Sequence, residues 1–213
     1  MGFRVFLITP FRFATGYGEI AVTGSAGLEI DIFSPEAKKG LLSFYRDIAR
    51  YPLNGVYVTD ISYGMKEGFT PYGIATYQHA FSEKLASRPN LNSPSLWRFA
   101  GLKSRHLTKL LNAIWAEIQL GAPEMEFGIN VPEILLIDPT KGLMETSLDY
   151  LELKEAQFDF YAVDSMGSGA QRVSELLLKY GRLEKVWFQR TRRETIVGLL
   201  EMPIQGVVVT ATQ

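Results

Sequence analysis

Short β-rich segments alternate with longer amphipathic segments along the whole chain, and this alternation limits the available folds most strongly. Alternation of this kind demands a mainly parallel sheet, either doubly wound or closed into a barrel. The pattern predicts six strands, with helices between them and a Gly- and Thr-rich loop at 15–27; the strands are expected at residues 4–8, 55–60, 125–131, 158–163, 185–189 and 206–210. The helices are expected from residue 34 and at 73–85, 95–120, 144–156, 171–180 and 194–201.

The length of the chain selects between these architectures. A complete barrel of eight strand–helix units takes about 250 residues. Six units within 213 residues therefore predict an α/β fold that is TIM-barrel-like but two units short. We expect residues 1–213 to form a single, partial β/α barrel domain.

The composition excludes several classes of function. With 22 Lys and Arg against 23 Asp and Glu, no overall field draws the chain to nucleic acid or to an anionic membrane. The absence of cysteine and the presence of only two histidines exclude disulfides, thiolate nucleophiles and zinc sites built from these residues. We therefore expect neither a metal nor another cofactor, although an all-carboxylate metal site remains open. No apolar run approaches the ~20 residues of a membrane span, and no signal peptide is visible.

Two carboxylates follow predicted strands, at the edge where parallel α/β folds bind ligands. Asp60 comes directly after a buried apolar strand, where it can act as an acid, a base or a nucleophile, or simply cap a loop. The sequence favours neither reading. Asp164 has the same position two strands later, so the two together form a candidate glycosidase pair, although a turn aspartate is the better explanation for Asp164.

Polar and aromatic residues at the same strand ends are candidates for binding substrate. Asn130 can orient a hydroxyl or acetamido group, or can play a structural role. Tyr63 and Trp187 can stack on sugar rings, although most aromatic residues in such a chain belong to the core. Gln189 ends the next predicted strand and completes the set.

Several segments match a known family in order and spacing, although none is diagnostic alone: 32–35, 54–60, 74–78, 96–99, 103–108, Asn130, Pro139, 158–163 and 185–189. Through them nearly the whole chain resembles the C-terminal glycoside-hydrolase-like domain of the bacterial poly-β-1,6-N-acetylglucosamine N-deacetylases. The resemblance implies a barrel that binds, and in some members cleaves, partially de-N-acetylated poly-β-1,6-N-acetylglucosamine of the biofilm matrix. It also implies that the first two β/α units are the ones missing here, and a place in the periplasm or cell envelope. The family's separate deacetylase domain has no counterpart in this sequence.

The chain departs from the family at its acidic positions. Thr59, Asp60 and Ile61 stand where the resemblance implies a histidine and two acids, and Gln189 stands where it implies a glutamate. Glutamine cannot ionise, so it neither takes a catalytic proton nor offsets the charge of glucosaminium.

Three functions therefore stay open, beside a small-molecule enzyme of unrelated type, because barrels support many chemistries. The chain is a hydrolase of an amino-sugar polysaccharide that uses Asp60, a glycan-binding or assembly module without catalysis, or a more distant glycosidase that uses Asp60 and Asp164. The lost carboxylates favour the second over the first. Because a partial barrel leaves sheet edges open unless they are covered, we also expect self-association.

Overall fold

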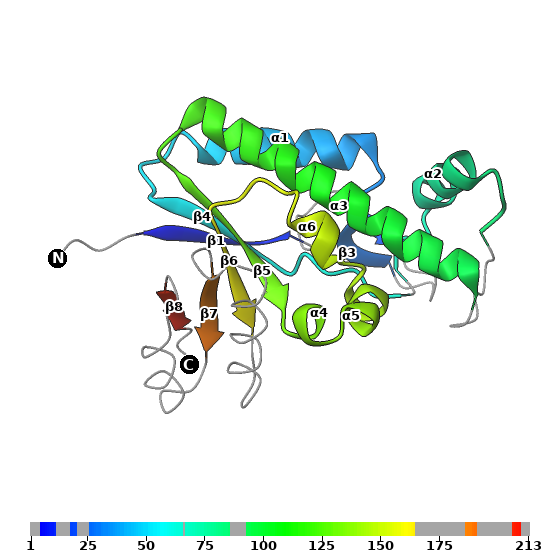
Figure 1. Cartoon of the computed structure of the whole chain (residues 1–213). Coiled ribbons are helices and arrows are strands. Elements are labelled where there is room, and N and C mark those ends of the chain that lie inside the picture. The colour runs from blue at the N-terminus through cyan, green and yellow to red at the C-terminus, as the bar shows by residue number, and fades with distance from the viewer. Residues whose placement is uncertain are drawn as a thin grey trace.

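A six-stranded parallel sheet is the framework of the molecule, which we describe from a computed structural model (Figure 1). The structure describes residues 5–11, 18–20, 26–65, 67–85, 93–164, 186–190 and 206–209. The strands lie in the order β1 (Phe6–Pro10), β4 (Gly55–Thr59), β5 (Glu126–Pro132), β6 (Phe160–Asp164), β7 (Val186–Arg190) and β8 (Gly206–Val209). Every neighbouring pair is parallel, so the predicted parallel α/β sheet is confirmed.

Two helices, α1 (Pro35–Ile48) and α3 (Pro94–Gly121), lie side by side along one face of the sheet (Figure 1). The helix α1 begins where the sequence predicts, because the Ser34 hydroxyl accepts a hydrogen bond from the Ala37 amide at 3.2 Å and Pro35 follows it. Arg46 of α1 and Glu117 of α3 form a two-pronged ion pair, with both N–O distances at 2.8 Å. None of the described helices has the length and apolar character that crossing a membrane requires.

The chain between β5 and β6 forms three short helices in place of the single helix predicted at 144–156. They are α4 (Ile134–Ile137), α5 (Pro139–Thr146) and α6 (Tyr150–Leu153). The prediction is wrong because Ser147 has a left-handed backbone, with φ of 51°, and Asp149 then caps a new helix. The helices predicted at 171–180 and 194–201 lie outside the described residues.

Two further elements differ from the prediction. The segment expected to be a loop at 15–27 overlaps an antiparallel pair of strands, β2 (Gly18–Ile20) and β3 (Ala26–Ile30). The helix α2 (Pro71–Phe81) ends four residues before the predicted boundary at 85, because Ser82 adopts a left-handed conformation with φ of 54°. The strand β2 was missed because its three residues are too few to show the alternation that identifies a strand.

The two faces of the sheet carry separate apolar clusters. The main core lies between the helices and the outward-facing residues of the strands, such as Val58 and Ile129. On the other face, which we call the inner face, Phe6, Tyr57, Phe160 and Ala162 form a smaller cluster. Strand alternation explains this division, because successive residues point to opposite sides.

Phe6 and Phe160 meet on the inner face although two strands separate them. Their ring centroids are 5.6 Å apart in an edge-to-face arrangement. Gly128 on β5 makes room for this contact, because a Cβ there would lie 2.1 Å from the Phe160 ring carbon Cζ. The ring of Phe160 thus occupies the space on β5 that a side chain at position 128 would fill.

Candidate functional site

Asp60 lies at the carboxyl end of β4, as predicted. The strand is buried along Gly55–Val58, and Asp60 is the first exposed residue after it. Its backbone is left-handed, with φ of 54°, a conformation that aspartate tolerates better than most residues do. The Thr59 hydroxyl donates a hydrogen bond of 3.1 Å to the carboxylate oxygen Oδ2 of Asp60. The carboxylate is therefore accessible to solvent while one neighbouring hydroxyl holds it.

Asn130 lies on the inner face of β5 and is half-buried. Its amide Nδ2 donates a hydrogen bond of 3.2 Å to the hydroxyl of Tyr57, a buried residue of β4. This contact fixes the amide group relative to the adjacent strand. Sequence reasoning missed Tyr57, although its position two residues before Thr59 puts it on the same face of β4.

Register pairing places the remaining strand-end candidates together. Asp164 of β6 pairs with Pro132 on one side and with Gln189 of β7 on the other. One row earlier, Ala162 pairs with Asn130 and with Trp187. Register partners in a parallel sheet occupy the same face, so positions 130, 164, 187 and 189 lie in two adjacent rows of the inner face.

Tyr63 lies apart from this group. Its side chain is fully buried in the main core, and its hydroxyl donates a hydrogen bond of 2.6 Å to the carbonyl oxygen of Ile30. A ring without exposed surface offers no face on which a sugar can stack. The burial favours a structural role for Tyr63 over the predicted role in binding substrate.

A second carboxylate, which the strand-end rule did not single out, lies between β3 and α1. Asp31 is buried, and burial raises the pKa of its carboxyl group. Hydrogen bonds from Thr70 and from the Phe33 amide oppose this effect, the latter at 2.9 Å. Phe33 precedes α1 and Thr70 precedes α2, so the hydrogen bonds of Asp31 link these two segments.

The described residues contain no group of three or more His, Asp or Glu side chains that is placed to hold a metal ion.

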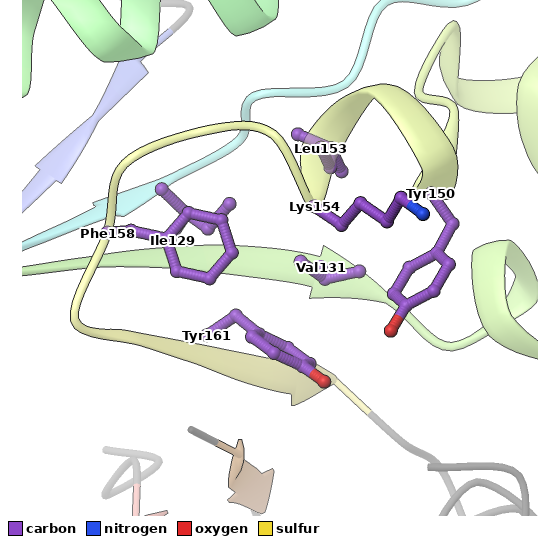
Figure 2. Close-up of a pocket in the computed structure, with 7 residues that line it drawn as sticks. All are labelled: Ile129, Val131, Tyr150, Leu153, Lys154, Phe158 and Tyr161. Atoms are coloured by element: carbon purple, nitrogen blue, oxygen red, sulfur yellow. The ribbon is translucent and has the colours of Figure 1, made fainter. Parts of the chain in front are cut away.

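A small apolar pocket lies on the opposite face of the sheet (Figure 2). Its volume of about 10 Å³ is enough for roughly one water molecule. Residues of β5, β6 and α6 line it together with Lys154 and Phe158: Ile129, Val131, Tyr150, Leu153, Lys154, Phe158 and Tyr161. Ile129 and Val131 flank Asn130 in sequence and therefore point away from the inner face. This pocket is separate from the strand-end site.

No protein-family model and no curated protein sequence matches the chain. Solved structures do match it. The PgaB (BpsB) glycoside hydrolase domain from Bordetella bronchiseptica superimposes with a TM-score of 0.78 at 16% identity, over 98% of this chain and 70% of that domain. The β-galactosidase of the Antarctic haloarchaeon Halorubrum lacusprofundi gives a TM-score of 0.66 at 11% identity, over 100% of this chain and 43% of that enzyme. An agarase gives 0.59 at 10% identity, over 97% of this chain and 37% of that enzyme.

These similarities identify the architecture. At such low identity they show the fold and leave the ligand open. The chain spans 70% of the length of the PgaB domain chain and less than half of the two other enzymes. The molecule has a partial, TIM-barrel-like α/β fold, and its structure resembles that of the PgaB glycoside hydrolase domain.

Proposed function

We propose that this chain is a polysaccharide-associated barrel that binds partially de-N-acetylated poly-β-1,6-N-acetylglucosamine at the carboxyl end of its sheet. The observation that carries the proposal is the register of β5, β6 and β7, which gathers positions 130, 164, 187 and 189 on the inner face. Asp60 follows β4 at the same end of the sheet. The likeness in fold to the PgaB glycoside hydrolase domain supports the choice of glycan.

Each residue has a role that suits an amino sugar. The exposed carboxylate of Asp60 can pair with a glucosaminium group, and the amide of Asn130 can bond an acetamido or hydroxyl group. Position 187 provides an indole, which is suited to stacking on a sugar ring, and Gln189 provides a neutral amide. These roles describe binding and require no proton transfer.

Hydrolysis is the second candidate, and the spacing of the strands favours one form of it. The strands β4 and β6 both pair with β5, so their backbones lie two strand spacings apart, about 10 Å. Carboxylates of inverting glycosidases are separated by roughly 6.5–9.5 Å and those of retaining enzymes by about 5 Å. An Asp60–Asp164 pair would therefore suit an inverting reaction better than a retaining one.

The test is incubation with partially de-N-acetylated β-1,6-glucosamine oligomers, with binding followed by NMR and cleavage by mass spectrometry. We expect binding by the wild type that weakens about tenfold or more in Asp60→Asn, which removes one charged contact. The matched control is Asp47→Asn, because Asp47 is an exposed carboxylate of α1.

The outcomes separate the candidates. Binding without shorter products indicates a glycan-binding module. Shorter products that disappear in both Asp60→Asn and Asp164→Asn indicate the hydrolase. An absence of both binding and cleavage would contradict the proposal and leave the fold as the only shared property.

A further inference from the structure

A lysine with no exposed surface lies beneath the segment that joins β4 to α2, which we call the β4–α2 loop (residues 60–70). Lys103 belongs to α3 and has a relative exposure of 0%. Lysine is almost never fully buried unless its ammonium group is paired, because removing the charge from water is costly. The position of Lys103 therefore calls for a specific reason.

The ammonium group of Lys103 holds the backbone of this loop. Its Nζ donates hydrogen bonds to the carbonyl oxygens of Gly64, at 2.8 Å, and Glu67, at 3.2 Å. The same nitrogen lies 5.2 Å from the centroid of the Phe99 ring, within the range of a cation–π contact. Charge-assisted hydrogen bonds of this kind are about twice as strong as those between neutral groups.

The loop is shaped to lie against the lysine. Gly68 has a φ of 80°, which side chains of L-residues rarely accept, and a Cβ there would lie 3.2 Å from Cδ of Lys103. The absence of a side chain at position 68 lets the loop backbone rest on the aliphatic stem of Lys103. Lys103 and Gly68 thus pack directly against each other.

Two other elements fasten the same loop. The Tyr63 amide donates to the Thr146 carbonyl oxygen at 2.7 Å, and the Tyr63 hydroxyl donates to the Ile30 carbonyl oxygen at 2.6 Å. Asp60 begins the loop, with a left-handed backbone of φ 54°. The loop that carries the candidate acid is therefore held by α3, α5 and the end of β3.

We infer that Lys103 is a positioning residue: its buried ammonium group gathers two loop carbonyls and so fixes the place of Asp60 at the carboxyl end of the sheet. Without the cation, these carbonyl dipoles lose a shared donor and the loop loses its link to α3. The part of the inference that concerns ligand binding rests on the function proposed above. The part that concerns the loop stands on the geometry alone.

The test compares Lys103→Met with Lys109→Met, since Lys109 is an exposed residue of the same helix. Hydrogen exchange of the loop amides is expected to accelerate about tenfold or more in Lys103→Met, while the amides of β4 change less. Oligomer affinity should fall about tenfold in Lys103→Met and stay unchanged in Lys109→Met. Equal acceleration in the loop and in β4 would mean a general loss of stability and would overturn the positioning role.

The role of Lys103 can be tested even if the proposed function is wrong or the Lys103→Met variant does not fold. If the wild type binds no oligomer, the proposed function fails, and loop exchange in the two variants still decides the role of Lys103. If Lys103→Met does not fold, ¹⁵N NMR of the wild type decides it. The ammonium protons of Lys103 should exchange with water far more slowly than those of Lys109, and equally fast exchange would overturn the inference.

Discussion

Individual side chains make specific packing contacts and hydrogen bonds on both faces of the sheet. On the inner face, Tyr57 fixes the amide of Asn130, and Phe160 covers Gly128. On the helix side, Tyr45 of α1 reaches Thr9 of β1 through a buried hydrogen bond of 2.9 Å between their hydroxyl oxygens. Contacts of this kind explain why particular residue types occur at positions where hydrophobic patterning alone allows many.

Gly128→Ala should destabilise the protein by about 1–3 kcal/mol, because the added methyl group would overlap the Phe160 ring. The control is Gly101→Ala in α3, where a Cβ meets nothing within 4 Å. That substitution should stabilise the protein by about 0.4–1 kcal/mol, because alanine loses less backbone entropy in a helix. Urea denaturation of both variants checks the pair. Equal effects at the two positions would contradict the role given to Gly128.

Stability should fall between pH 10 and pH 12 in a way that depends on Tyr45. Burial raises the pKa of Tyr45 to about 12, and the hydrogen bond with Thr9 only partly opposes this. Over this range the unfolded state releases the phenol proton while the folded state retains it, so rising pH favours unfolding. Tyr45 contributes about 2–3 kcal/mol to the free energy of unfolding below pH 10 relative to pH 12. This contribution decreases as the pH rises from 10 and is lost by pH 12.

Chemical denaturation across this pH range, in the wild type and in Tyr45→Phe, measures the effect. The slope of unfolding free energy against pH should become shallower in Tyr45→Phe. Tyr51→Phe is the control, because Tyr51 is 64% exposed. Identical slopes in all three proteins would show that Tyr45 does not contribute.

At the scale of elements, the sequence predicts the central strands well and their connections less well. The expected strand at 55–60 agrees with β4 within one residue, because a buried parallel strand is a continuous apolar run bounded by turn residues. The break at Ser147 depends on a left-handed backbone that helical periodicity does not reveal.

The candidate site shows the same division between local and long-range information. The strand-end rule predicts where Asp60 and Asn130 lie, because parallel strands end at one edge of the sheet. It cannot predict the burial of Tyr63, which depends on Ile30, or that of Lys103, which depends on carbonyls far away in the sequence. These contacts exist only once distant elements pack together.

Thr70→Ala should destabilise the molecule by about 1–2 kcal/mol, because Thr70 both caps α2 and bonds Asp31. Its hydroxyl oxygen accepts from the Gly73 amide at 3.0 Å, and the residue is buried. Ser93→Ala is the matched control, since Ser93 precedes α3 without a capping hydrogen bond from its side chain. Thermal denaturation should show a clearly larger fall in Tm for Thr70→Ala, and equal falls would count against the capping role.

At the scale of the whole molecule, the arrangement is that of a barrel opened between two edge strands. In the part of the chain that the structure describes, β1 pairs only with β4, and β8 pairs only with β7. In a complete barrel each edge would meet another strand, so that no backbone donors and acceptors remained unpaired. The two edge strands are therefore the places where further strands of a complete barrel would pair.

We predict self-association through the edge of the sheet at β1. Val5 and Ile8 are 55% and 54% exposed, although Ile8 pairs in register with the buried Tyr57. An exposed edge with apolar side chains is a template for pairing with another chain, and a lysine placed there opposes such pairing. Light scattering should show a mass that rises with concentration for the wild type and stays lower for Ile8→Lys. Leu120→Lys is the control, because Leu120 is 83% exposed near the end of α3 and away from the edge. A wild type that remains a monomer at high concentration, or a Leu120→Lys variant that dissociates as fully as Ile8→Lys, would contradict association through β1.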